Sequence, residues 1–271
     1  MKKALITGVS GQDGYFLTQF LMDRGGYEVH GTVRRNSRMS QGTLERMPRQ
    51  YRERLQVHYG GDITDGTFLS LLIKENQYDE IYHLAAQSFV AYSFQNPAST
   101  YDINIGGTLN VVNAIRDYSP SSRLYFAATS EMFGQPKTTP PQNENTPPLY
   151  PRSPYAISKL AGFWTVRVYR EAYSLYMCNG ILFNHESEVR GPPEFVTMKI
   201  ARAVARIANG DTEPLVLGNL DARKDWGYAK DYVEGMWMML QKERPDDYVL
   251  ATGGRYTLSG SLPLRPSVWP A

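Results

Sequence analysis

Residues 3–17 read KALITGVSGQDGYFL, and this stretch decides the fold that we predict for the chain. A short apolar run ends at a glycine and is followed by apolar residues at helical spacing, so we expect a strand, a turn and a helix. Gly8, Gly11 and Gly14 have the spacing G-x-x-G-x-x-G. Glycines at this spacing permit a tight turn and let a pyrophosphate approach the helix N-terminus. The position between a strand and a helix favours a dinucleotide-binding turn, although glycine turns without a ligand are common.

Short apolar runs alternate with helical patterns along much of the remaining chain. Strands are expected within residues 27–35, 55–62, 78–86, 123–130 and 178–185, and helices within residues 65–76 and 104–118. Alternation of this kind predicts a parallel sheet covered by helices on both faces, as in a Rossmann-like, doubly wound α/β fold. Ligands of such sheets bind beyond the carboxyl ends of the strands, so the residues that follow each apolar run are candidates for a binding site.

Three of these strand ends carry residues suited to a dinucleotide. The second run ends in Arg34 and Arg35, about twenty residues beyond the glycine turn, where an acidic residue would bind the ribose of NAD and an arginine suits the 2′-phosphate of NADP. NADP is therefore the expected cofactor, although two arginines at a strand end are also compatible with simple solvation. The third run ends at Asp62 and Ile63, placed to meet the adenine. Small residues within 84–88 let the backbone approach the cofactor.

The segment RSPYAISKLAG places Tyr155 four residues before Lys159 on an expected helix. Residues at this spacing share a helix face, and a nearby ammonium favours the phenolate form of a tyrosine, which is then a base. Taken alone, the pair is more often two amphipathic side chains on a solvated surface. Thr129 and Glu131 follow the fifth apolar run, at the edge of the sheet where a nicotinamide would lie. Together the four residues form a plausible catalytic set.

Composition limits the classes of protein that the chain can belong to. It has 271 residues, 42% of them hydrophobic and 21% charged, with a net charge of +2, which suits one large globular domain or two smaller ones. The near-neutral balance argues against a nucleic-acid partner. A single cysteine, Cys178, cannot form an internal disulfide, which fits the cytoplasm. No signal peptide is expected, and no apolar run approaches the roughly 20 residues of a membrane span.

Several blocks of sequence resemble, in the same order, those of the GDP-mannose 4,6-dehydratase family within the extended short-chain dehydrogenase/reductase superfamily. The blocks are ALITGVSGQDGYFL, HGTVRR, HLAAQSFV, TSEMFG, YPRSPYAISK, CNGILFNHES, GNLDARKDWGYAKDYVEGMWMML and PDDYVLATG. The glycine and tyrosine motifs indicate only the superfamily, whereas NGILFNHES and DWGYAKDYVE are typical of the dehydratase. The resemblance is expected to run from Ala4 to about Gly253 and to stop in a truncated or divergent C-terminus.

The resemblance implies a role for individual positions. It places the catalytic residues at Thr129, Glu131, Tyr155 and Lys159. It places cofactor contacts at Gly8, Val9, Ser10, Gly11, Gln12, Asp13, Gly14, Arg35, Asp62, Ile63, Leu84, Ala85, Ala86, Gln87, Ser88, Lys159, His185 and Arg190. Substrate contacts are expected at Asn184, Val196, Lys199 and Arg223, and no metal site is expected. Lys224 stands before Asp225 where an arginine is usual in the family.

The resemblance also implies an activity and an assembly. The expected reaction is the NADP-dependent dehydration of GDP-mannose, a lyase step toward GDP-fucose and related deoxysugars, in a homodimer or homotetramer. We expect an NADP-binding domain at 1–184, onto which 219–250 packs back, and a partial substrate-binding lobe at 185–218 and 251–271. Two alternatives stay open: another nucleotide-sugar epimerase or dehydratase, or a cofactor-binding protein with little activity.

Overall fold

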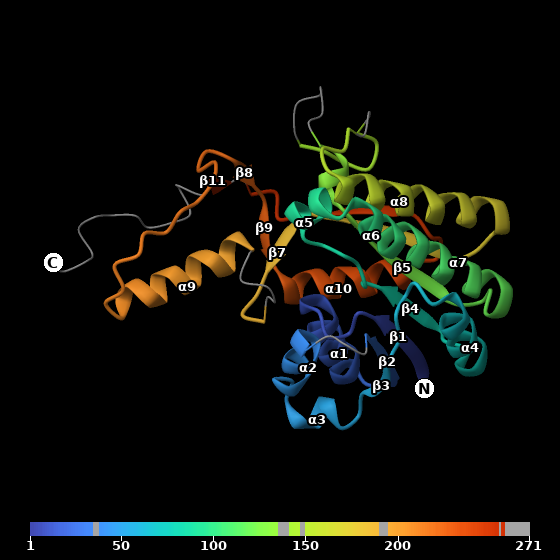
Figure 1. The fold of residues 1–271 in the computed structure, drawn as a ribbon. Coiled ribbons are helices and arrows are strands. Elements are labelled where there is room, and N and C mark those ends of the chain that lie inside the picture. The colour runs from blue at the N-terminus through green and yellow to red at the C-terminus, as the bar shows by residue number, and fades with distance from the viewer. Residues whose placement is uncertain (35–37, 135–140, 147–149, 190–194, 255, 258–271) are drawn as a thin grey trace.

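The computed structural model describes residues 1–34, 38–134, 141–146, 150–189, 195–254 and 256–257 (Figure 1). Within these ranges, seven strands form one sheet in the order β10-β6-β5-β4-β1-β2-β3, and all neighbours are parallel. The strands are β1 Lys2–Thr7, β2 Tyr27–Val33, β3 Gln56–Tyr59, β4 Glu80–His83, β5 Arg123–Thr129, β6 Met177–Leu182 and β10 Asp247–Leu250. The predicted doubly wound α/β fold is confirmed, and β10 adds an edge strand that returns to the sheet late in the chain.

Helices cover both faces of the sheet, as the alternation predicted. α1 and α10 pack on one face, and α4, α7 and α8 pack on the other. Their bounds are α1 Gln12–Arg24, α4 Gly66–Asn76, α7 Gly107–Tyr118, α8 Pro154–Tyr173 and α10 Ala229–Leu240. Leu5 and Ile6 of β1 belong to different core clusters because successive strand residues point to opposite faces. The sheet is therefore a layer between two apolar cores.

Four short helices lie in the connections between β2 and β3 and between β4 and β5. They are α2 Arg38–Glu45, α3 Arg49–Arg52, α5 Val90–Gln95 and α6 Pro97–Tyr101. A π-helix, Asp102–Gly106, runs directly into α7, so the single helix expected within 104–118 begins with a wider turn. A 3-10 helix, Ser130–Met132, follows β5. No helix in the described ranges has both the length and the apolar character that crossing a membrane requires.

A smaller group of elements lies to one side of the seven-stranded sheet (Figure 1). It contains α9 Val196–Ala208, and two small sheets in which β7 Asn184–Glu186 pairs with β9 Trp226–Tyr228 and β8 Arg223–Lys224 pairs with β11 Tyr256–Thr257. α9 stands away from the main sheet, whereas α10 and β10 return to it. The division into an NADP-binding domain at 1–184 with 219–250 and a substrate-binding lobe at 185–218 and 251–271 stays a prediction.

The glycine turn lies where the strand order reverses, between β1 and β4. Gly8 has a left-handed backbone, with φ of +73°, and a Cβ built on it would lie 2.9 Å from Cα of Ala85, which follows β4. A Cβ on Gly14 would lie 2.6 Å from Cα of Val9. These contacts explain why larger residues would displace the turn. They also place it at the switch point where such sheets bind ligands.

Candidate active site

A cavity of about 890 Å³ opens at the carboxyl ends of the main strands. Residues at or just after the ends of strands β1 to β6 line it, together with residues at the starts of α1 and α8. The predicted site residues that line it are Gly8, Ser10, Gly11, Gln12, Asp13, Gly14, Asp62, Ile63, Leu84, Ala85, Ala86, Ser88, Thr129, Glu131, Tyr155, Lys159, Asn184, His185 and Val196. Most of the predicted site is therefore brought to one place, although its members span nearly 190 positions of sequence.

Four predicted residues do not line this cavity. Val9 is fully buried beneath the glycine turn, against Gly31 of β2. Gln87 is held by Asn104, whose Oδ1 accepts from the Gln87 N–H at 2.8 Å. Lys199 lines a second cavity, and Arg223 is exposed on β8. Arg35 and Arg190 lie outside the described residues.

The Tyr155–Lys159 pair is placed by the start of α8. Ser153 caps the helix, with its Oγ accepting from the Ala156 N–H at 3.0 Å, and Pro154 occupies the first helical position. Tyr155 thus lies in the first turn and Lys159 one turn later on the same face. Lys159 is only 4% exposed, and its Nζ donates to the Ala127 carbonyl at 2.8 Å. Burial lowers the pKa of Lys159 to about 8, against the opposing effect of Asp13.

Thr129 and Glu131 are placed by the end of β5. The strand ends at Thr129, whose Oγ1 accepts from the Glu131 N–H at 3.3 Å and so caps the 3-10 helix. The Glu131 carboxylate faces the cavity and accepts a hydrogen bond from Nζ of Lys224 at 3.0 Å. A threonine hydroxyl and a carboxylate therefore lie on the wall of the same cavity as the tyrosine and the lysine.

Asp13 and His185 join the first turn of α1 to β7. Nε2 of His185 lies 3.0 Å from both Asp13 carboxylate oxygens, and its Nδ1 lies 2.9 Å from the Phe183 carbonyl. Nε2 of Gln12 donates to the His185 carbonyl at 3.0 Å. The imidazole stacks on Tyr232, with ring centroids 4.3 Å apart. These contacts fix one wall of the cavity at the N-terminus of α1.

A buried chain of hydrogen bonds beneath the cavity was not predicted from the sequence. Thr108 donates to the Asn104 carbonyl, so Nε2 of His83 must donate to Thr108 Oγ1, at 3.1 Å. Nδ1 of His83 then accepts from Thr7 Oγ1 at 2.8 Å, and Thr7 accepts from the Ala85 N–H at 3.2 Å. Burial, with a smaller effect of the Lys159 charge, lowers the pKa of His83 to about 3. The neutral imidazole therefore links the switch point to the π-helix.

Asn104 extends this support to α8. Its side-chain amide donates to Ser158 Oγ at 2.9 Å and to the Gln87 carbonyl at 3.0 Å. Because Ser158 precedes Lys159, the π-helix braces the turn that carries the lysine. The segment NIGG gave a helical pattern but no sign of this role, since the partners of Asn104 are distant in sequence.

Further residues, several of them charged, line the two ends of the cavity. Arg34, Thr43 and Arg46 line the end near β2, and the sequence indicated only the first of these. Glu186, Glu188, Phe195, Met198 and Arg202 line the end near α9 and were not predicted. Arg202 lies three residues after Lys199 on α9, and this spacing was the signal that could have indicated it.

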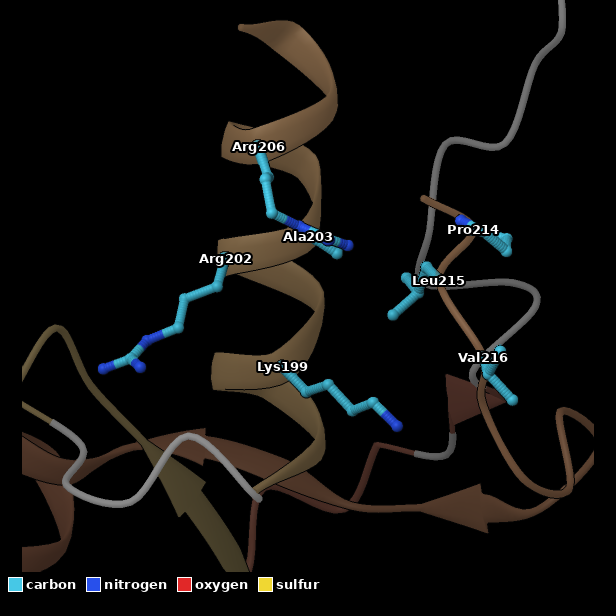
Figure 2. Close-up of a pocket in the computed structure, with 7 residues that line it drawn as sticks. All are labelled: Lys199, Arg202, Ala203, Arg206, Pro214, Leu215 and Val216. Atoms are coloured by element: carbon cyan, nitrogen blue, oxygen red, sulfur yellow. The ribbon is translucent and has the colours of Figure 1, made fainter. Parts of the chain in front are cut away.

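A second cavity of about 300 Å³ adjoins α9 (Figure 2). It is lined by Lys199, Arg202, Ala203, Arg206, Pro214, Leu215 and Val216. Figure 2 shows Lys199 and Arg206 extending toward the segment 214–216, with Arg202 on another side of the helix. Arg206 is paired with Asp211 at 3.0 Å and Glu213 at 2.6 Å. Arg202 lines both cavities, so the two adjoin at this residue.

Two solved structures that share this fold are a nucleotide-sugar epimerase and a nucleotide-sugar dehydratase. The UDP-glucose 4-epimerase of Thermus thermophilus, in complex with NAD, has a TM-score of 0.80 and 24% identity, covering 94% of this chain and 79% of that one. The dTDP-glucose 4,6-dehydratase of Streptomyces venezuelae has a TM-score of 0.81 and 24% identity, covering 95% and 78%. At this level of identity the likeness concerns the fold.

A family model described as GDP-mannose 4,6 dehydratase matches residues 5–265, and the chain belongs to that family. The GDP-mannose 4,6-dehydratase of Yersinia enterocolitica is 49% identical over 263 residues, which are 95% of this chain and 69% of that one. The enzyme of the same name from Drosophila melanogaster is 50% identical over 95% of this chain and 65% of its own. The expectation that the resemblance ends near Gly253 is wrong, because the family match reaches residue 265.

Proposed function

We propose that the chain catalyses the NADP-dependent dehydration of GDP-mannose to GDP-4-dehydro-6-deoxy-mannose. The observation that carries this proposal is the convergence of Thr129, Glu131, Tyr155 and Lys159 on one cavity, in a chain of the GDP-mannose 4,6 dehydratase family. An epimerase acting at C4 needs the tyrosine and the lysine but no elimination base. The carboxylate of Glu131 beside that pair therefore favours the dehydratase over the epimerase.

The cavity fits a dinucleotide. Gly8, Gly11 and Gly14 line the cavity at the N-terminus of α1, where backbone N–H groups can bind a pyrophosphate. Thr32 lines the cavity with a buried hydroxyl that has no hydrogen-bond partner among the described residues. Arg34 and Arg46 line the same end, which supports a 2′-phosphate and hence NADP. When bound, this cofactor supplies the hydride chemistry.

Tyr155 is the base of the oxidation step. Its phenolate takes the proton of the mannose 4-hydroxyl as C4 is oxidised to a ketone. Lys159 stabilises the phenolate from one helical turn away and would hold the ribose of the nicotinamide. With a pKa of about 8, the lysine is mostly charged at neutral pH and can take part in proton transfer nearby.

Glu131 acts after this oxidation. The 4-ketone acidifies the proton on C5, which the Glu131 carboxylate removes, while the hydroxyl on C6 leaves as water with a proton from the same residue. Thr129 hydrogen-bonds the ketone oxygen and polarises it. The net change is the loss of one water: the oxidation at C4 is balanced by reduction at C6, and the proton that Tyr155 took from the 4-hydroxyl is returned to C5.

The GDP part of the substrate lies toward α9. Asn184 and Val196 line the main cavity on that side, and Lys199 and Arg202 offer cations to a diphosphate. The second cavity, between α9 and residues 214–216, offers the apolar side chains of Pro214, Leu215 and Val216 to a guanine. Arg223 remains a candidate contact at its exposed position on β8.

The proposal also covers assembly and location. The exposed apolar side chains Leu109, Ile157, Trp164 and Val168 on α7 and α8 are suited to a helix-to-helix contact between two copies, hence a homodimer or homotetramer. The single cysteine, Cys178, is buried and unpaired, which fits the reducing cytoplasm.

The test is to incubate the purified protein with GDP-mannose and follow the nucleotide sugar by mass spectrometry. A product lighter by one water supports the dehydratase. An isomer of unchanged mass would instead identify an epimerase. If the protein binds the cofactor but does not convert GDP-mannose, it is a cofactor-binding protein without this activity.

A further inference from the structure

Lys224 reaches the carboxylate of Glu131 from the smaller group of elements. Its Nζ lies 3.0 Å from Glu131 Oε1, and the two residues are 93 positions apart in the chain. We propose that Lys224 is a positioning residue that holds Glu131 in the orientation needed for elimination. This inference rests on the proposed function and adds to it a residue outside the catalytic four.

The backbone around Lys224 is anchored on both sides. Lys224 lies opposite Tyr256 in the antiparallel pair of β8 and β11. The next residue, Asp225, is 9% exposed and accepts from both the N–H and the hydroxyl of Thr252, each at 3.0 Å. β9 follows directly and pairs with β7. The backbone of Lys224 is therefore held in place by these contacts.

Glu131 is held at its backbone but needs a partner for its side chain. Its N–H donates to Thr129, whereas its carboxylate is three rotatable bonds further out. Among the described residues, Oε1 has the ammonium of Lys224 as hydrogen-bond donor and Oε2 has none. The ammonium thus fixes one carboxylate oxygen and leaves the other for the proton on C5.

The exposure of the Glu131–Lys224 ion pair indicates that the pair orients Glu131 and does little to stabilise the fold. The Glu131 and Lys224 side chains are 35% and 41% exposed. Ion pairs this open to water contribute little to the stability of a fold. A catalytic group displaced by about 1 Å, in contrast, can lose on the order of 10²-fold in rate. Loss of the ammonium should consequently affect the elimination step far more than folding.

The experiment compares K224M, which keeps most of the stem and removes the charge, with K224R, which keeps a cation. K242M is the matched control, because Lys242 is exposed and lies away from the cavity. Single-turnover reactions with GDP-mannose are followed by near-ultraviolet absorbance of reduced cofactor and by the mass of the product. We expect K224M to oxidise C4 at the wild-type rate and to eliminate water about 10–100-fold more slowly. K224R should recover much of that loss, and K242M should match the wild type.

A double variant tests whether Lys224 acts through Glu131. If it does, K224M combined with E131Q eliminates water no more slowly than E131Q alone, because the residue to be positioned is already lost. An additional loss in the double variant would overturn the inference, and so would K224M turning over at the wild-type rate.

A third result would also overturn it. A weaker affinity of K224M for GDP-mannose with an unchanged elimination rate would make Lys224 a contact to the diphosphate. Thermal unfolding of each variant shows whether K224M folds. If it does not, K224Q, which also removes the charge, replaces it in the single and the double variant. A wild-type protein that releases no dehydrated product would overturn the proposed function itself, a result visible before any variant is compared.

Discussion

The neutral imidazole of His83 should make the stability of this protein fall as pH falls. His83 is 1% exposed, and both ring nitrogens are used by the hydroxyls of Thr7 and Thr108. Protonation of Nδ1 would remove the acceptor for Thr7 and leave a charge in the sheet interior near Lys159. The folded protein therefore resists a protonation that the unfolded chain accepts readily.

The size of the effect follows from the two pKa values of His83. Its pKa is about 3 in the folded protein, against 6.5 without the fold. Because the folded value is depressed, the stability is complete above pH 6.5 and declines as pH falls through the range between the two values. At pH 5 the unfolded state binds this proton and the folded state does not, which costs about 2 kcal/mol. The lowered pKa of His58, caused by burial and by His30, acts in the same direction.

The assay is urea unfolding of the wild type and of H83N at pH 7 and pH 5. Asparagine cannot titrate, so the difference between the two pH responses isolates the contribution of His83 from that of the carboxylates. We expect the wild type to lose about 2 kcal/mol more than H83N between these pH values. The variant is expected to be less stable at pH 7, which does not affect the comparison. Equal losses in both proteins would refute the argument that His83 is neutral in the fold.

Three further predictions concern the cofactor, the acid–base residues and the assembly. R35A should weaken the binding of NADP much more than that of NAD, as measured by fluorescence titration, and equal losses would contradict the 2′-phosphate assignment. Y155F should lower C4 oxidation by about 10²–10⁴-fold and give no absorbance of reduced cofactor, whereas E131Q should still oxidise C4 and accumulate that absorbance. If E131Q binds both ligands and gives no such signal, Glu131 is not the elimination base. Val168 is 53% exposed on α8, so V168D should shift the mass measured by light scattering toward the monomer, while Y59D at the sheet edge should not. A wild-type protein that is monomeric at micromolar concentration would contradict the assembly.

The sequence predicted the sheet because buried parallel strands are continuous apolar runs whose ends are marked by glycine or polar residues. The glycine turn was equally visible, since local geometry requires glycine at Gly8 and Gly14. β10 was harder to predict, because it is a half-buried edge strand of four residues, Asp247–Leu250, with an apolar run of only three. The π-helix at Asp102–Gly106 escaped prediction because its pattern does not differ from that of the α-helix it joins.

The candidate site could be predicted from the sequence where its residues lie close together in the chain. Tyr155 and Lys159 are related by one helical turn, and Thr129 and Glu131 by one strand end. The contacts of His83 with Thr7 and of Glu131 with Lys224 join positions 76 and 93 residues apart, and a single sequence contains no pattern that relates such pairs. Lys199 is a different case: the resemblance predicted it as a substrate contact, and its side chain lines the second cavity and not the main one.

The residues proposed for the two chemical steps are held by different parts of the molecule. The residues proposed for oxidation, Tyr155 and Lys159, are supported from the main sheet, through the Ala127 carbonyl and the bond from Asn104 to Ser158. The residue proposed for elimination, Glu131, starts from the same sheet, but its carboxylate is held from β8. Displacement of β8 should therefore disturb elimination before it disturbs oxidation. A chain whose main sheet and α9 are intact and whose β8 segment is displaced would oxidise C4 and stop there, because Glu131 is the proposed catalytic residue that is held from β8.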